Sequence, residues 1–112
     1  MDRSKDALIA RVAEGWVQEG PSSSYWKGRD GFYWLLPQYN TLPLILRATE
    51  AFVRQKPWRS WSVDGPITGV TERYCATVFD RQDHCVHGYG PTFEAALAEG
   101  LYKACEEVGD GL

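Results

Sequence analysis

The sequence predicts an α+β domain in which three helices are layered on an antiparallel sheet of three or more strands. Three segments carry apolar residues at helical spacing, and the period changes to two between Trp58 and Tyr89. Short connections between those strands favour an antiparallel meander. The predicted order is helix, aromatic loop, helix, three strands and helix. At 112 residues, residues 1–112 are expected to form one domain.

The first helix is expected to run from about Ser4 to Glu19. Ser4 is a suitable N-cap, and Asp6 lies near the positive end of the helix dipole. Gly20-Pro21 is expected to end the helix. The apolar stripe comprises Leu8, Ile9, Val12, Ala13 and Trp16.

The segment from Pro21 to Asn40 shows neither the helical nor the strand period of apolar residues, yet it is rich in aromatic residues. Six rings fall within fifteen residues: Tyr25, Trp26, Phe32, Tyr33, Trp34 and Tyr39. A surface loop is ordinarily polar, so these rings are expected to be buried in the core, in a partner chain or against a ligand. Within the segment, Phe32–Leu36 is a candidate short strand, which Pro37 would suit to a sheet edge.

The second helix is expected to begin after Asn40 or Thr41, with Pro43 tolerated in its first turn. Gln55-Lys56-Pro57 is expected to end it. Its buried stripe comprises Leu44, Ile45, Ala48, Ala51 and Phe52.

Three strands are predicted at Trp58–Val63, Arg73–Phe79 and His84–Tyr89, with turns at Asp64–Pro66 and Asp80–Asp83. Trp58 and Trp61 are expected to point to opposite faces, so one is core and the other is covered by a helix or exposed. On the middle strand Tyr74, Ala76 and Val78 share one face, while Cys75, Thr77 and Phe79 share the other. Both faces carry apolar residues, so either helices cover both or one is an oligomer interface.

The last helix is expected to follow Pro91, with Thr92 as its cap and Gly109 at its end. Gly100 lies on its buried stripe, where it would let a strand or helix approach closely.

Composition limits the function classes. The net charge of −3 and the pI of about 5.3 argue against binding to duplex nucleic acid, which needs a basic face. No apolar run approaches the ~20 residues that span a bilayer, and no signal peptide is evident, so a cytoplasmic location is expected. Cys75, Cys85 and Cys105 have no C-x-x-C spacing and are expected to be reduced.

Four segments resemble the phage ABA-sandwich domain family: Arg11–Trp16, Pro37–Thr41, Tyr74–Phe79 and Gly90–Ala96. Asn40 and Leu42 stand where that family usually has Ser and an acidic residue. The resemblance implies a sheet between helical layers, a phage protein acting in the bacterial host cell, and no assigned enzymatic activity. Some small accessory phage proteins are oligomeric sponges that trap nucleotide second messengers of bacterial immunity, and this context suggests an analogous role.

A nucleotide sponge needs rings to stack the base and cations to neutralise phosphate, and Trp26-Lys27-Gly28-Arg29 supplies both. The backbone at Thr92 would add donors at a helix N-terminus. The predicted ligand contacts are Trp26, Lys27, Arg29, Tyr33, Tyr39, Arg59, Arg73, His87 and Thr92.

Metal and catalytic chemistry have weaker support. In His84-Cys85-Val86-His87, Cys85 and His87 share a strand face that Cys75 could join, but no fourth ligand is evident and no metal is predicted. Asp80, Asp83 and His84 make a polar corner in a segment that a turn explains equally well.

Three hypotheses follow. The first is a homo-oligomeric protein, with no cofactor, that sequesters a cyclic nucleotide or cyclic ADP-ribose type messenger without cleaving it. The second is a protein-interaction module that inhibits a host defence or metabolic protein through its aromatic loop. The third, an enzyme that degrades such a messenger, lacks a convincing acid–base pair, so the protein is not expected to be an enzyme.

Overall fold

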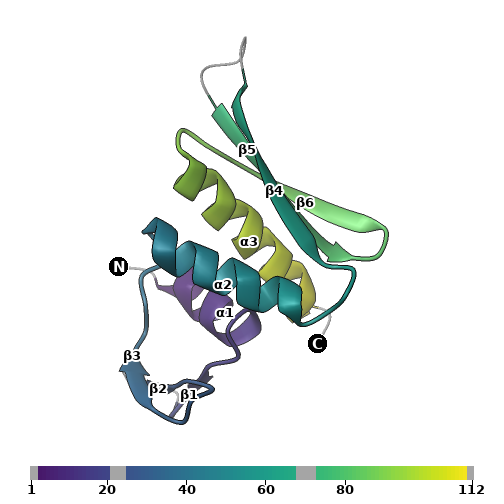
Figure 1. The fold of residues 1–112 in the computed structure, drawn as a ribbon. Helices are drawn as coiled ribbons and strands as arrows, with labels where there is room; N and C mark the ends of the chain where they lie inside the picture. The colour runs from purple at the N-terminus through teal and green to yellow at the C-terminus, as the bar shows by residue number, and fades with distance from the viewer. Residues whose placement is uncertain (1–2, 21–24, 68–72, 111–112) are drawn as a thin grey trace.

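The computed structural model describes residues 3–20, 25–67 and 73–110, which form three helices and two three-stranded sheets. The order confirms the α+β prediction and adds a second, smaller sheet near the N-terminus (Figure 1). The elements are α1 (Ser4–Val12), β1 (Val17–Gln18), β2 (Tyr25–Lys27), β3 (Tyr33–Leu35), α2 (Leu42–Arg54), β4 (Ser60–Ile67), β5 (Arg73–Arg81), β6 (His84–Gly90) and α3 (Phe93–Asp110).

The larger sheet is an antiparallel meander in the order β4-β5-β6, as the short connections predict. Its strands alternate as expected, with Ala76 and Val78 of β5 and Val86 of β6 buried against α3. Figure 1 shows all three helices on the same side of this sheet, with α1 and α2 packed beyond α3. The sheet therefore lies at one side of the domain and not between helical layers, which differs from the arrangement that the family resemblance implies.

The contact between α3 and β6 depends on Gly88. A Cβ on Gly88 would overlap the backbone nitrogen of Gly100, so strand and helix backbones meet directly. A Cβ on Gly100 itself would meet Ala76 and Val78 of β5 at an ordinary 3.4 Å, so the close approach occurs at Gly100 but the glycine that it requires is Gly88. Thr92 caps the helix through a hydrogen bond from the Ala95 backbone N–H to its Oγ1 (3.1 Å), also as predicted.

Helix α1 ends at Val12, well before the predicted Glu19. The backbone turns at Gly15, whose φ of +72° is favourable for glycine alone, and the Trp16 N–H closes the turn by donating to the Ala10 carbonyl (2.9 Å). The predicted cap is also wrong, because the N-cap residue is Arg3 and Ser4 is already helical. The apolar period continues to Trp16 because that ring packs on the core from the turn after the helix.

Two strand boundaries differ from prediction. β4 begins at Ser60 and continues to Ile67 through a register shift, so Asp64–Pro66 belongs to the strand and is not the predicted turn. β5 extends to Arg81, which places Asp80 in the strand with its side chain buried. Helix α2 matches prediction, with Thr41 as N-cap and Pro43 in the first turn. Among the described residues, no helix combines the length and apolar character that crossing a membrane requires.

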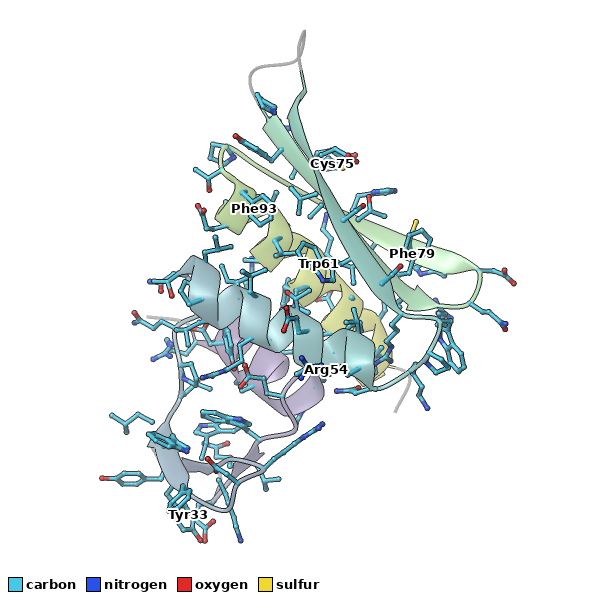
Figure 2. All side chains as sticks on the ribbon, viewed as in Figure 1. Tyr33, Arg54, Trp61, Cys75, Phe79 and Phe93 are labelled. Carbon is cyan, nitrogen blue, oxygen red and sulfur yellow. The ribbon has the colours of Figure 1, made fainter. Side chains whose placement is uncertain are left out.

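Trp58 and Trp61 lie in different environments, one exposed and one packed against a helix. Trp61 of β4 packs edge-on against Phe93 of α3, with ring centroids 6.4 Å apart at 83° (Figure 2). Trp58 precedes the strand and is exposed, with Lys56 Nζ 5.8 Å from its ring centroid. Arg59, its neighbour, instead places its guanidinium 4.0 Å from the Phe52 ring centroid.

Candidate functional site: the small aromatic sheet

The aromatic segment that the sequence leaves without regular structure forms most of the small sheet, in the order β1-β2-β3. Lys27 of the central strand is paired with Val17 on one side and Tyr33 on the other, while Tyr25 is paired with Leu35. Because paired residues point to the same face, these side chains share one side of the sheet. We call this set the outward face: Val17, Tyr25, Lys27, Tyr33 and Leu35.

The outward face is apolar and open to solvent. The exposed fractions are 64% for Val17, 57% for Tyr25, 52% for Tyr33 and 66% for Leu35. Phe32, in the turn that leads into β3, is also exposed. Figure 2 places Tyr33 at the end of the molecule away from the larger sheet. A gathering of large apolar side chains on such a short segment indicates a surface that binds something.

The opposite face of the small sheet turns toward the helices and carries Trp26 and Trp34, which are paired across β2 and β3. Trp26 is 6% exposed, so its ring is buried and is not displayed on the surface, and the ligand contact predicted for it stays a prediction. Its flanking Lys27 points to the other face because side chains alternate along a strand. Trp26 instead lines a pocket of about 610 Å³ together with Arg3, Ser4, Gln18, Leu36 and Gln38.

A groove separates the turn of the small sheet from α2. Two hollows of about 250 and 290 Å³ adjoin there, and both are lined by Trp16, Asp30 and Arg47. Arg29 borders the first hollow and Trp34 the second. We call these two hollows together the tryptophan groove. It offers two indole rings and two guanidinium groups over a short distance, which is a chemistry suited to a planar anionic ligand.

Arg47 of the groove is held by a buried carboxylate. Its Nε and Nη2 donate to the two oxygens of Glu14 at 2.9 and 3.0 Å, and its guanidinium carbon lies 5.7 Å from the Trp16 ring centroid. Hydrogen bonding to Glu14 raises the pKa of Arg47, so it stays charged. This bidentate pair gives the groove a rigid floor and also neutralises much of the charge that an anion would seek.

The small sheet is tied to α1 through Arg3 and Asp6. Arg3 Nε donates to Asp6 Oδ2 at 2.7 Å, and its Nη2 donates to the carbonyls of Leu36 and Pro37, both at 2.8 Å. The other oxygen of Asp6 accepts the Tyr39 backbone N–H at 3.1 Å. These contacts hold the segment between β3 and α2, so they set where the small sheet stands.

The predicted ligand contacts do not form one site. Lys27 and Tyr33 lie on the outward face, and Arg29 borders the tryptophan groove with its guanidinium against Gly15. Arg73 and His87 lie on the larger sheet. Tyr39 and Thr92 do come together, because both line a separate pocket of about 300 Å³ between the starts of α2 and α3.

Tyr39 and Arg59 serve the interior. Tyr39 is buried, its hydroxyl has no hydrogen-bond partner among the described residues, and burial together with the Glu14 carboxylate raises its pKa. Arg59 donates to the carbonyls of Phe52 and Asp80 and to the side chain of Gln55. Burial lowers the pKa of Arg59. Its guanidinium is therefore occupied in joining α2 to β5.

His87 belongs to the face of the larger sheet that points away from the helices. Its Nδ1 is 3.1 Å from Thr77 Oγ1 and 3.9 Å from Cys75 Sγ, while its Nε2 is 3.9 Å from Cys85 Sγ. Figure 2 shows Cys75 and Phe79 on this same side. The two thiols flank different ring nitrogens, so one ion bound to His87 would meet one cysteine at a time. The three cysteines are free, as predicted.

Sequence reasoning missed Trp16 and Arg47 as groove residues. The sequence predicts Trp16 as part of the first helical stripe, and no pattern in the sequence singles out Arg47. The available sign was the glycine of Gly15-Trp16, which can end a helix and re-aim the ring that follows.

Comparisons with protein-family models, with curated proteins and with solved structures gave no match for this chain. The resemblance to the phage family therefore stays a prediction, and the functional argument rests on the surfaces described above.

Proposed function

We propose that this chain is a non-enzymatic binding protein that docks another protein on the outward face of its small sheet. The observation that carries the proposal is the exposure of Val17, Tyr25, Tyr33 and Leu35 on one side of three short strands. Tyrosine supplies a large contact area at low entropic cost, and it is enriched at the energetic centres of protein interfaces.

The charge on the face guides the choice of partner. Lys27 lies between Val17 and Tyr33. The Glu19 backbone N–H donates to the Tyr25 carbonyl at 3.2 Å, so exposed Glu19 stands opposite Tyr25 and adds a carboxylate at the edge of the face. The expected occupant is therefore an apolar surface that presents a carboxylate opposite Lys27 and a cation or neutral group opposite Glu19. If the phage resemblance holds, that surface belongs to a host defence or metabolic protein.

The test uses a photo-reactive phenylalanine analogue placed at Tyr33, with a matched probe at Phe79 on the larger sheet. Both positions are exposed aromatics, so they differ in location and not in chemistry. We expect one host protein to crosslink from position 33, to be silent from position 79, and to bind the purified chain directly. Lys27→Glu should then weaken that binding by about tenfold or more.

Two results would overturn this proposal. One is equal crosslinking from positions 33 and 79, which would show non-specific contact. The other is unchanged affinity in both Lys27→Glu and Tyr33→Ser, measured with the purified partner. Phe79→Ser serves as the control, because it removes a comparable exposed ring elsewhere.

The tryptophan groove supports a second candidate, sequestration of a nucleotide-type messenger by a homo-oligomer. Trp34 is half exposed and faces the groove, where a base stacked on an indole gains roughly 1–3 kcal/mol. Arg29 borders the same groove and would meet the phosphate. Native mass spectrometry of the chain with a pool of cyclic nucleotides and cyclic ADP-ribose type compounds separates the candidates. An intact retained compound, lost in Trp34→Ala, supports sequestration, whereas a shortened product would point to an enzyme.

A further inference from the structure

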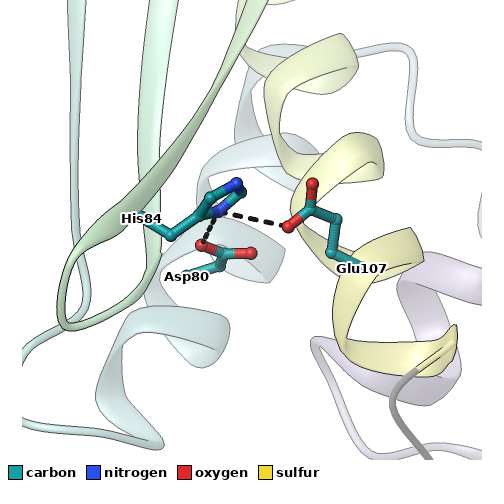
Figure 3. Close-up of side chains that lie close together, drawn as sticks. All are labelled: Asp80, His84 and Glu107. Carbon is teal, nitrogen blue, oxygen red and sulfur yellow. Dashed lines mark hydrogen bonds and ion pairs between the residues drawn. The ribbon is translucent and has the colours of Figure 1, made fainter.

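Three side chains that are distant from the small sheet converge at the end of the β5–β6 hairpin (Figure 3). Asp80 comes from β5, His84 begins β6 and Glu107 lies in α3. His84 Nδ1 is 2.8 Å from Asp80 Oδ1 and 3.1 Å from Glu107 Oε2. One ligand atom from each of the three residues lies within 4.8 Å of the others.

The environment of Asp80 is unusual for a carboxylate. Its side chain is 0% exposed, and its Oδ2 has no hydrogen-bond partner among the described residues. Figure 3 shows this second oxygen on the side of Asp80 that faces Glu107. A buried carboxylate oxygen without a donor is costly, and such atoms are rare in folded proteins. The atom therefore points to something that the protein residues do not supply.

The neighbouring cations leave this oxygen unpaired. Arg59 Nε donates to the backbone carbonyl of Asp80 at 3.3 Å, and Arg81 Nη2 lies 3.2 Å from Glu107 Oε2. An N–H at Nδ1 of His84 can donate toward Asp80 Oδ1 and Glu107 Oε2, but it leaves Asp80 Oδ2 without a partner among the described residues. A cation placed among the three side chains would satisfy both carboxylates at once.

We propose that Asp80, His84 and Glu107 form a binding site for a divalent transition-metal ion, with Zn²⁺ as the best fit. The ligand set is one imidazole and two carboxylates. Imidazole favours first-row transition ions over Mg²⁺ and Ca²⁺, which prefer oxygen ligands alone. Three protein ligands with the remaining position open to water are typical of non-structural zinc sites.

The distances fit this assignment after a small rearrangement. Ligand atoms about 2.0–2.2 Å from one tetrahedral zinc ion lie roughly 3.3 to 3.6 Å from each other. The separations of 2.8 and 3.1 Å around His84 Nδ1 are a few tenths of an ångström shorter, so the side chains would move slightly apart to admit the ion. Binding at Nδ1 requires the ring proton of His84 to sit on Nε2.

The site has one closed and one open side. Asp80 anchors the ion from the buried side, while the side chains of His84 and Glu107 are 40% and 36% exposed. The open position therefore faces solvent and accepts water or an anionic oxygen. The ion would also link the hairpin to α3, so it should stabilise the folded chain, because the unfolded chain does not hold the three ligands together.

The test is a titration of the chelator-treated full chain with ZnCl₂, followed by calorimetry and thermal unfolding. We expect one ion per chain and a rise in Tm of about 5 °C or more at saturating Zn²⁺. His84→Asn should weaken binding by about 100-fold. Because His84 is partly exposed, this variant is expected to fold, and its circular dichroism verifies that. Excess MgCl₂ should not compete.

His87→Asn is the matched control, because it removes the other histidine of the chain, which lies beside Cys75 and Cys85. It should bind Zn²⁺ like the unmodified chain. Loss of binding in His87→Asn but not in His84→Asn would place the metal on the thiol-bearing face and overturn the proposal. Absence of any saturable binding, or unchanged binding in His84→Asn, would also overturn it. Nitrogen-15 shifts of the two imidazoles identify the coordinated ring independently.

Discussion

Gly88 of β6 and Gly100 of α3 lie backbone to backbone, with no side chain between strand and helix. A Cβ at Gly88 would also crowd the Ala96 carbonyl. The atoms that this Cβ would meet belong to the helix backbone, so no flexible side chain could move aside to make room for it. The missing Cβ of Gly88 therefore sets how closely the longest helix approaches the larger sheet.

Gly88→Ala is expected to destabilise the protein by about 3 kcal/mol or more, because an added methyl group forces α3 away from β6. Urea denaturation followed by circular dichroism measures the loss. Gly20→Ala is the control, since a Cβ there meets no atom of the described residues within 4 Å, and it should change stability by about 0.5 kcal/mol or less. Equal effects in both variants would contradict the close approach.

Asp6→Ala is expected to loosen the segment between β3 and α2 more than the rest of the fold. The Tyr39 backbone N–H loses its acceptor, and Arg3 loses the carboxylate that orients it toward Leu36 and Pro37. Hydrogen exchange should accelerate at Tyr39 by about tenfold or more, because a native hydrogen bond protects that amide. Lys5→Ala, a change in the same helical turn, should leave exchange at Tyr39 unaltered.

Glu14→Gln is expected to cost about 2 kcal/mol of folding stability, because it removes the charged partner of Arg47 at a buried position. The figure lies below that of a fully buried pair, since the Arg47 side chain is half exposed. The exposed pair of Glu50 and Arg54 provides the comparison. Glu50→Gln should change the unfolding free energy by about 0.5 kcal/mol or less. Denaturation curves of the two variants, measured in parallel, compare the two losses.

Thiol labelling under native conditions is expected to modify Cys75 and Cys85 and to leave Cys105 intact. Burial raises the pKa of the Cys105 thiol to about 12, even though Arg59 acts in the opposite direction. A thiol reacts as its thiolate, so the folded chain should show two labelled cysteines by mass spectrometry. Labelling of three before unfolding would contradict the burial of Cys105.

The raised pKa of the Cys105 thiol also predicts a loss of stability at alkaline pH. The pKa of Cys105 rises from 9.0 to about 12 in the folded chain, so the unfolded chain releases this proton first. The stability that the buried, protonated thiol adds to the folded chain is fully present below pH 9 and declines as pH rises toward 12. Cys105→Ala should be less stable at neutral pH but should lose less between pH 9 and pH 11, by about 2 kcal/mol. Denaturation at several pH values measures how steeply the unfolding free energy falls with pH in the unmodified chain and in Cys105→Ala.

Local sequence patterns are sufficient to predict those helices and strands whose start and end are not changed by contacts with other elements. α2 and α3 follow their apolar stripes, and Thr41, Pro43 and Thr92 stand where helix starts prefer such residues. The middle strand also alternates as predicted, since one face meets α3 and the other meets no helix. In each case the periodicity of burial and the local backbone preference agree.

Longer-range effects explain the errors. The apolar spacing of α1 continues to Trp16 in the sequence because that ring still packs on the core, although the backbone has already turned at Gly15. The small sheet joins strands of two or three residues, too short for a recognisable period. Trp26 stands between polar residues in the sequence, yet it is buried, because its pairing with Trp34 places it on the face that turns toward the helices.

The sequence alone determined the α+β class, the antiparallel meander and the two strongly amphipathic helices, because those depend on periodicity within one element. Only the tertiary structure decided which aromatic side chains face solvent, because that depends on the register of β1, β2 and β3. The tertiary structure likewise brought Glu107 to Asp80 and His84. Burial of one carboxylate beside another is a property of packed elements, and no spacing along a single chain segment encodes it.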